Sequence, residues 1–308
     1  MAIESHPASS DEVKSGFVAL VGRPNAGKST LTNAIVGRKV SITSDTPQTT
    51  RQRLRAVLDR DDAQLVIVDT PGLHKPQDAL GAELNRAALA SLQDVDVAAM
   101  LVDATKPFGR GDEWVASHVA KARAKRVLVI TKVELSTHVA IEKQIEAARA
   151  VCAFDEVVVL SAVTGFNVDT FVDTVVKYLP SGPRWFPRDM SSDQPIEVMI
   201  AEFVREKILR TAREEVPHAV GVIVDDFTYD DRKDLYSVFA IVYVARDSQK
   251  GIIIGKGGSA LKAVGTEARE DLERLLGSKV FLNLSVKVKK DWRRDAAQVR
   301  RFGYGEGR

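Results

Sequence analysis

Five short apolar stretches, each with the length of a buried strand, recur between residues 17 and 160 of the chain. They are 17–21, 63–68, 95–102, 126–130 and 157–160. Helical stretches lie between and after them, at 28–36, 81–92, 113–121, 140–150 and 168–178. An apolar strand followed repeatedly by a helix is typical of a mostly parallel sheet covered by helices. The pattern therefore predicts an α/β domain.

The alternation stops at residues 179–195, where Pro, Gly, Ser and bulky aromatic residues gather as in a linker or an interdomain packing strip. The elements beyond it come in a different order. They are a helix at 197–211, strands near 219–224, 237–244 and 280–288, and helical stretches at 259–264 and 266–276. This order predicts a small α+β domain.

The chain therefore divides into four predicted segments. They are a disordered tail at 1–15, an α/β domain at 16–180, a linker at 181–195 and an α+β domain with a basic C-terminal segment at 196–308. A length of 308 residues agrees with two domains, because one domain usually has about 100 to 200 residues. The net charge is only +2, but residues 251–308 hold 13 Lys and Arg against 7 Asp and Glu, a difference of +6. This asymmetry favours a polyanion contact at that end.

A single cysteine, Cys152, cannot form an internal disulfide, and no secretory leader is evident. Both features favour a reducing cytoplasm. The apolar runs are far shorter than the roughly 18 residues of a membrane-spanning helix. The five histidines form no cluster with the spacing of metal ligands.

The strongest motif, at residues 22–29, matches the G-x-x-x-x-G-K-[ST] phosphate loop between a predicted strand and a predicted helix. In such a loop the main-chain N–H groups and the helix N-terminus hold phosphate oxygens. We expect Lys28 to reach the β- and γ-phosphates and Ser29 to bind Mg²⁺. The expected nucleotide contacts here are Gly22, Arg23, Pro24, Asn25, Ala26, Gly27, Lys28, Ser29 and Thr30.

Two downstream segments have the positions expected of partners for this loop. Asp69, at a strand end, is expected to hold Mg²⁺, and the N–H of Gly72 is expected to sense a γ-phosphate. In the polar segment 48–51, Thr50 is our choice over Thr49 to complete the Mg²⁺ shell. The expected catalytic residues are Lys28, Thr50, Asp69 and Gly72, with Thr70 and Pro71 as further nucleotide contacts.

Two further strand ends carry candidate base-binding residues. Residues 131–134 read Thr-Lys-Val-Glu where guanine-binding proteins carry Asn-Lys-x-Asp, and residues 161–163 read Ser-Ala-Val. A carboxylate can accept from the ring N–H and the exocyclic amine of guanine. The expected base contacts are Thr131, Lys132, Glu134, Ser161, Ala162 and Val163.

In the second domain, residues 255–258 read Gly-Lys-Gly-Gly and resemble the G-x-x-G loop of KH domains. Glycines in this loop let an RNA backbone approach the protein main chain closely. A basic strand end follows at residues 287–294. A flexible turn and a solvated edge strand are the alternatives for these two features. The expected RNA contacts are Gly255, Lys256, Gly257, Gly258, Lys287, Lys289, Lys290 and Arg293.

With residues 22–29, 48–51, 69–74 (DTPGLH) and 255–258 in this order, the chain resembles the Era family of GTPases. The resemblance covers about residues 16–304. It implies a P-loop GTPase domain followed by a KH-type domain, hydrolysis of GTP to GDP with Mg²⁺, and binding to 16S ribosomal RNA near its 3′ end. It also implies a part in assembly of the small (30S) ribosomal subunit, a monomer in the cytoplasm, and peripheral contact with the cytoplasmic face of the membrane. Asn25 lies where several relatives coordinate K⁺.

Three positions depart from the pattern. Thr131 and Glu134 replace the Asn and Asp of the base motif, and Leu73 stands where some GTPases carry a water-orienting Gln. We therefore expect weaker base recognition and slow intrinsic hydrolysis. His74 could serve as a general base, but an exposed loop histidine fits the sequence as well. A non-enzymatic RNA-binding factor with a decayed nucleotide domain is the main alternative, and a metabolite kinase would leave residues 255–258 unexplained.

Overall fold

The computed structural model describes residues 13–44, 54–73, 79–211 and 220–295, together with 297 and 299. Its first sheet has seven strands in the order β2-β3-β1-β4-β5-β6, with β7 beside β1. The strands are β1 (Val13–Gly22), β2 (Leu54–Asp59), β3 (Ala63–Asp69), β4 (Val97–Asp103), β5 (Lys125–Thr131), β6 (Glu156–Val159) and β7 (Ser181–Gly182). All neighbours pair in parallel except β2 with β3 and β7 with β1.

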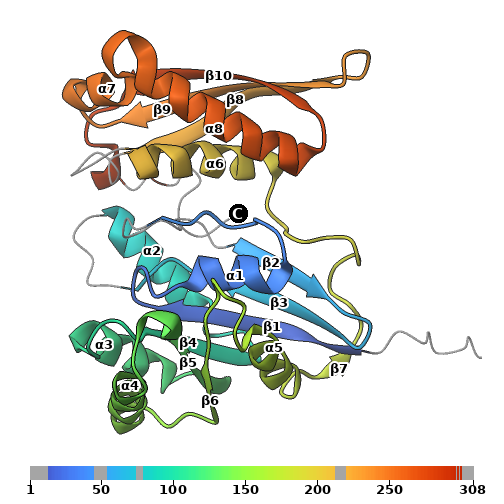
Figure 1. Cartoon of the computed structure of the whole chain (residues 1–308), viewed down its shortest axis with the longest axis vertical. Coiled ribbons are helices and arrows are strands. Elements are labelled where there is room, and N and C mark those ends of the chain that lie inside the picture. The colour runs from blue at the N-terminus through green and yellow to red at the C-terminus, as the bar shows by residue number, and fades with distance from the viewer. Residues whose placement is uncertain are drawn as a thin grey trace, which may run out of the picture.

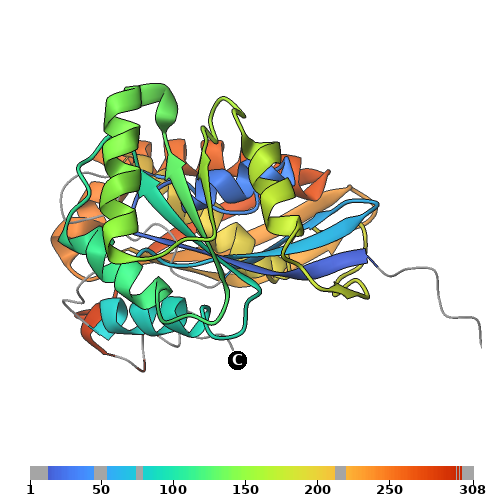
Figure 2. The same cartoon turned by 90° about the horizontal axis from the view of Figure 1, so that it is seen from below.

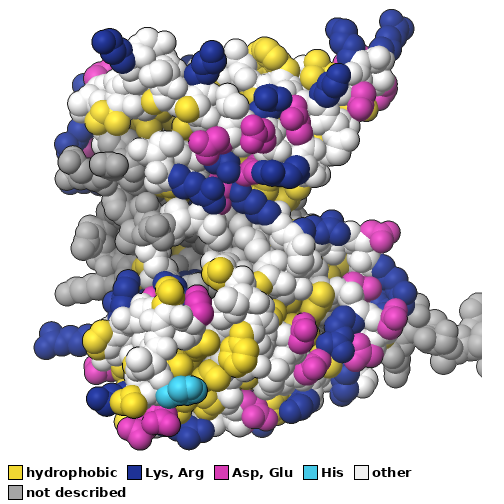
Figure 3. Space-filling view, in the orientation of Figure 1, with side chains coloured by type: hydrophobic (Ala, Val, Ile, Leu, Met, Phe, Trp, Pro, Cys, Tyr) yellow, Lys and Arg dark blue, Asp and Glu magenta, His cyan; other side chains and the backbone are white. Residues whose placement is uncertain are grey.

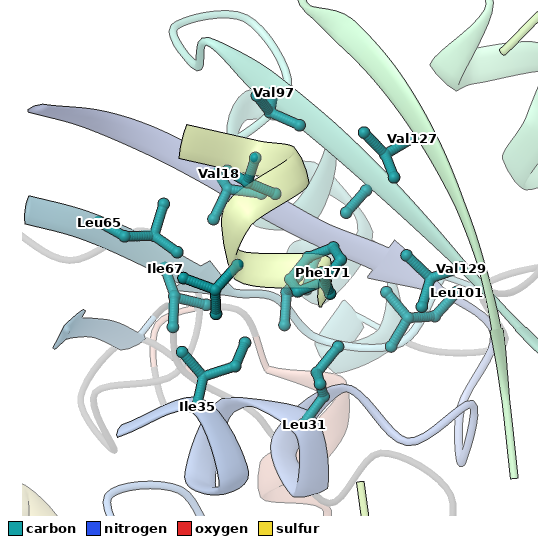
Figure 4. Close-up of a cluster of buried hydrophobic side chains, with 14 of the residues drawn as sticks. Val18, Leu31, Ile35, Leu65, Ile67, Val97, Leu101, Val127, Val129 and Phe171 are labelled. Carbon is teal, nitrogen blue, oxygen red and sulfur yellow. The ribbon is translucent and has the colours of Figure 1, made fainter. Parts of the chain in front are cut away.

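Helices cover both faces of this sheet (Figures 1 and 2). They are α1 (Lys28–Val36), α2 (Ala79–Ala90), α3 (Arg110–Val119), α4 (His138–Val151) and α5 (Val168–Val176). On one face, Leu31 and Ile35 of α1 and Phe171 of α5 meet Val18 and Leu101 of the central strands (Figure 4). The other face packs against α2, α3 and α4. The carboxyl ends of β1, β3 and β5 thus lie at one edge, where the candidate nucleotide residues follow them.

The first sheet differs from the sequence prediction at β1, at β2 and at β7, which lies within the predicted linker. β1 begins at Val13, inside the segment predicted to be tail, because Val13 and Lys14 pair with β7 and Lys14 also lies beside Ala63 of β3. The prediction also missed β2, which is short and is antiparallel to β3. An edge strand of six residues with a polar Arg55 and Asp59 gives little apolar signal.

The segment predicted to be a linker lies along the first domain. Its residue Ser192 bridges Ala56 of β2, and Arg184 pairs with Asp59 at 3.0 Å. The side-chain amide of Gln64 accepts from the N–H of Trp185 at 2.7 Å. These contacts pack Arg184, Trp185 and Ser192 of the predicted linker against the first domain.

The second domain has a three-stranded sheet in the order β10-β9-β8, with helices on one face (Figure 1). Its elements are α6 (Ile196–Thr211), β8 (Gly221–Asp230), β9 (Leu235–Val244), α7 (Asp247–Ile254), α8 (Ser259–Leu276), β10 (Lys279–Val288) and the short turns η3 (Lys256–Gly258) and η4 (Trp292–Arg294). The two helical stretches predicted at 259–276 form one helix, α8, because Gly265 continues it without a break. No helix of the described ranges is both long and apolar enough to cross a membrane.

The two domains meet through the segment that follows α1. The Lys39 ammonium contacts the carboxylates of Glu206 in α6 and, at 2.7 Å, Asp271 in α8. The N–H of Thr43 donates to Glu206 at 3.0 Å, and Ile42 packs among apolar side chains of α6. In the space-filling view, Lys and Arg side chains gather near the middle of the molecule, where the two domains meet (Figure 3).

A second contact joins α2 to the end of the chain. Leu80 and Leu84 of α2 pack against Trp292 of η4 and against Val299. All four side chains are fully buried or nearly so. The segment after α1 and the helix α2, which follows the Asp69–Leu73 segment, therefore both contact the second domain. Both also adjoin the phosphate site.

Candidate nucleotide and RNA sites

The phosphate loop connects β1 to α1, as the sequence predicts. Asn25 and Gly27 have positive φ angles of 63° and 91°, which open the turn and direct main-chain N–H groups to one side. Arg23 is held outside the loop by an ion pair of 2.8 Å with Asp112 of α3. The loop ends at the N-terminus of α1, where the main-chain N–H groups of the first turn and the helix dipole favour an anion.

Lys28 is buried inside this loop, where its ammonium donates to the main-chain oxygens of Arg23 (3.0 Å) and Gly22 (3.3 Å). Burial lowers the pKa of Lys28 to about 8, against the opposing effect of the nearby Asp69 charge. An ammonium held by loop carbonyls is positioned to pair with phosphate oxygens that enter the same loop.

Asp69 is the buried acceptor of the site. Its Oδ2 accepts from the hydroxyls of Ser29 and Ser41, each at 2.8 Å, and its Oδ1 is buried with no hydrogen-bond partner. Burial raises the pKa of Asp69, although Lys28 and the two hydroxyls act in the opposite direction. An orphaned carboxylate oxygen beside a serine hydroxyl is an oxygen donor set that suits Mg²⁺. The residues present therefore fit the ion.

Gly72 lies against the phosphate loop. A β-carbon at this position would come within 2.7 Å of the Pro24 backbone, so only glycine permits the approach. The N–H of Leu73 donates to Gly22 O at 3.1 Å, and the Thr70 hydroxyl donates to Leu20 O at 2.7 Å. Pro71, between them, is buried. Thr50, with the rest of 48–51, and His74 lie outside the described residues.

Some residues of the base motif hold neighbouring segments together, and others are exposed. Thr131 is buried, and its hydroxyl lies 2.8 Å from Ala26 O and 3.2 Å from Val102 O, so it ties β5 to the phosphate loop. Lys132 has a φ of 59° and pairs with Asp103 at 2.8 Å. Burial alone would raise the pKa of Asp103, but hydrogen bonds from Lys132 and Thr105 lower it. The sequence prediction did not identify Asp103, at the end of β4, or Ser41, in the segment after α1, since a lone Asp or Ser carries no distinguishing signal.

Glu134 is exposed in the short turn η1 (Val133–Leu135), directly after Lys132. Ser161 is fully buried, and its hydroxyl accepts from the N–H of Thr164 at 3.2 Å. Ala162 is partly buried, whereas Val163 is exposed. The carboxyl ends of β5 and β6 thus place both candidate base segments side by side, next to the phosphate loop.

The predicted RNA loop joins α7 to α8. Gly255, Gly257 and Gly258 all have positive φ angles, and a β-carbon on Gly255 would come within 2.7 Å of Ala260. Nothing lies within 4 Å of such an atom on Gly257 or Gly258. Gly255 is therefore required by packing, and the exposed Lys256-Gly257 tip is open to a ligand.

A groove with a volume of about 390 Å³ runs from this loop between α8 and β10. Its helix side is formed by Gly258, Leu261, Lys262, Gly265, Thr266 and Arg269, and its strand side by Leu282, Asn283 and Leu284. β10 is the edge strand of its sheet, so its free main-chain groups border the groove. The sequence prediction missed Lys262, Thr266, Arg269 and Asn283, because only packing of the helix on the sheet brings them together.

The basic residues after the groove lie at the end of β10, which runs back beside α7. Lys287 and Lys290 are exposed and Lys289 is half-buried. Arg293 belongs to η4, and its side chain lies outside what the structure describes. The described residues contain no group of three His, Cys, Asp or Glu arranged to hold a metal ion.

A family model described as 50S ribosome-binding GTPase matches residues 17–132, and a KH-domain model matches residues 215–293. Era of Aquifex aeolicus, in a variant form bound to GDP·AlF4⁻, superimposes with a TM-score of 0.92 and is 38% identical, over 96% of this chain and 100% of that one. Era in complex with MgGDPNP and nucleotides 1506–1542 of 16S ribosomal RNA gives the same four values. The chain belongs to the Era family. As an Era-family protein it combines a P-loop GTPase domain with a KH domain, and the predicted fold class is confirmed.

Proposed function

We propose that this Era-family chain binds and hydrolyses GTP with Mg²⁺, binds 16S ribosomal RNA through its KH domain, and assists assembly of the 30S subunit. The observation that carries the proposal is the presence of both sites on one chain that is 38% identical to Era over nearly its whole length. The relative's complex with MgGDPNP and 16S ribosomal RNA supports both ligands.

In this proposal the phosphate loop supplies positioning and charge. Lys28 leaves the loop carbonyls and pairs with the β- and γ-phosphates, while Ser29 and Asp69 hold Mg²⁺ and Thr50 completes its shell. Held by these residues, Mg²⁺ would supply positive charge against the charge that develops on the phosphate oxygens. Gly72 approaches the γ-phosphate through its N–H. Burying a charged side chain is unfavourable unless it serves a function, and these roles explain why Lys28 and Asp69 are buried.

Hydrolysis is slow in the absence of a partner, because Leu73 is fully buried and offers no polar atom to orient water. Asn25, at the left-handed turn of the loop, would hold K⁺, which would add positive charge that stabilises the transition state. Replacing K⁺ by Na⁺ at constant ionic strength tests this role, since a loop without a K⁺ site hydrolyses GTP equally in both salts.

Glu134 recognises guanine in this proposal, with Lys132 covering the base and Ser161, Ala162 and Val163 on its other side. Its carboxylate is one methylene longer than that of aspartate, and its exposure leaves it free to reach the base edge. Thr131 supports the site indirectly by tying β5 to Ala26. The decayed-domain alternative has no support in the geometry of Lys28, Ser29 and Asp69, which is intact.

The RNA strand lies in the groove between α8 and β10, with its backbone against Lys256 and Gly257 and positive charge from Lys262, Arg269 and the end of β10. Such a protein acts in the cytoplasm, where ribosomes are assembled, as a monomer with peripheral contact to the membrane surface.

Two titrations test the proposal together. Competition binding is expected to show preference for GTP over ATP, and filter binding is expected to show retention of a 16S 3′-end RNA that weakens as salt rises. Equal affinity for the two nucleotides would reject the guanine site. Equal affinity for this RNA and an unrelated single strand would reject the specific RNA role.

A further inference from the structure

The helices α6, α7 and α8 pack on one face of the KH-domain sheet, and part of the opposite face is exposed. Alternate residues of β9 and β10, such as Val242 and Val286, point to the helices and form the core. The residues between them point the other way, and two of these are large and exposed. Phe239 is 39% exposed and Phe281 is 49% exposed. Their ring centroids lie 5.9 Å apart at an interplanar angle of 64°.

The surroundings of this aromatic pair are polar and basic along β10. Lys279, Asn283 and Lys287 occupy the same face of that strand and are exposed. On the other side, Asp226 of β8 lies opposite Phe239, so negative charge borders the pair there. The charges therefore favour binding of an anionic partner on the part of the face formed by β9 and β10, and disfavour it on the part formed by β8.

The pair also adjoins the groove. Leu282 and Leu284 of β10 line the groove, and Phe281 and Asn283 alternate with them along the same strand. A strand is only about 4.8 Å wide in the plane of its sheet. A chain that leaves the groove over this edge therefore meets Phe281 at once. The far end of the face is closed, because Ile223 and Tyr243 pack with Trp292.

We propose that this face is a second RNA contact, where unpaired bases of the strand held in the groove stack on Phe281 and Phe239 while Lys279 and Lys287 contact its phosphates. The inference rests on the RNA groove proposed above. Aromatic side chains on an open sheet face provide such a platform, because every base has a π-face to stack. A protein partner fits less well, since a stable interface needs about 800 Å² per partner with an apolar centre. The side chains around the two rings are mostly Lys, Asn, Ser and Asp, while the apolar Ile241 beside Phe239 is buried.

The platform extends the RNA site beyond the length that the groove accommodates. A KH groove holds about four nucleotides. We therefore compare two single-stranded RNAs, one of about four nucleotides and one lengthened at both ends to about twelve. The protein is the full chain, either unchanged or with Phe239→Ala and Phe281→Ala together. Tyr229→Ala is the matched control, since Tyr229 is 44% exposed on the same domain but points to the helix-covered side of the sheet.

The double alanine variant is expected to lose about tenfold or more in affinity for the long RNA, the effect of losing stacking on one base, and to bind the short RNA as before. Phe281→Trp, made in the unchanged chain, keeps an aromatic ring at this position and is expected to retain affinity for the long RNA. In addition, Lys279→Ala is expected to reduce the slope of log affinity against log salt by about one for the long RNA alone.

Unchanged affinity for the long RNA would overturn the proposal, and so would an equal loss for both RNAs, which would mean a general effect on the domain. Normal binding of both RNAs with a loss of binding to 30S particles would assign the face to a protein partner instead. The variant that combines Lys256→Asp with Gly257→Asp tests the RNA groove separately. If this variant bound the short RNA normally, the groove proposal itself would fail, whatever the result for the aromatic pair.

Discussion

The buried charge of Lys28 is expected to make nucleotide binding depend on pH. Burial lowers the pKa of this ammonium to about 8, below its ordinary value of 10.5. Bound phosphates favour the charged form. Below pH 8 the group is charged with and without nucleotide, so affinity is unaffected. Above pH 8 the empty site loses the proton and binding must restore it, so affinity for GTP is expected to fall as pH rises.

Calorimetry in two buffers of different ionisation enthalpy measures this proton. We expect uptake of about one proton at pH 9 and little at pH 7. Lys28→Ala is expected to abolish most binding at both pH values, because the phosphates lose their paired cation. Equal proton uptake at pH 7 and pH 9 would show that Lys28 does not titrate in this range.

Glu134 is the residue on which guanine preference is expected to depend. Glu134→Ala removes the proposed acceptor of two charge-assisted hydrogen bonds from guanine, each with a net contribution of about 1.5 to 3 kcal/mol. Affinity for GTP is expected to fall at least to the level of ATP, whereas Glu134→Asp is expected to retain a preference. Competition binding provides the measurement, and Glu142→Ala, an exposed glutamate of α4, is the matched control. A preference that survives in Glu134→Ala would assign the base to other residues.

At the scale of elements, the loop between α7 and α8 is expected to separate RNA binding from hydrolysis. Lys256→Asp with Gly257→Asp replaces a positive charge and adds negative charge where we propose that the RNA backbone lies. No protein atom lies within 4 Å of a β-carbon on Gly257, and Asp tolerates a positive φ better than most residues, so the fold is expected to persist. RNA binding is expected to collapse at every salt concentration, while intrinsic GTP hydrolysis is retained.

Filter binding over a salt series and a phosphate-release assay test the two halves of this prediction. Lys289→Ala serves as the comparison, since loss of one phosphate contact is expected to weaken binding only modestly and to reduce its salt slope by about one. If the double-Asp variant kept wild-type RNA affinity and an unchanged circular dichroism spectrum, the loop would be a simple turn and not an RNA contact.

At the scale of the whole molecule, Lys39 connects the GTPase domain to α6 and α8. Burial alone would raise the pKa of Glu206, but hydrogen bonds from Lys39 and the Thr43 N–H lower it, so the Glu206 carboxylate is charged at neutral pH. Lys39→Ala leaves Glu206 with its contacts to Lys207 and Arg210. We expect a loss of about 1 to 2 kcal/mol in stability, because Lys39 is partly solvated, and a looser arrangement of the domains.

Small-angle scattering and thermal unfolding measure these two effects. Arg60→Ala is the matched control, since Arg60 forms ion pairs with Asp62 and Asp173 that stay within the first domain and are exposed. A radius of gyration that increases equally in both variants, or in neither, would contradict a role for Lys39 between the domains.

The sequence by itself determined the α/β followed by α+β order, the phosphate loop at residues 22–29 and the loop at residues 255–258, because each depends on local periodicity or on glycines whose backbone angles are set locally. The tertiary structure alone decided which distant side chains meet. Ser41 reaches Asp69, Lys132 reaches Asp103 and Lys39 reaches Glu206. Single polar residues carry no periodic signal, so their partners follow only from strand order and domain packing.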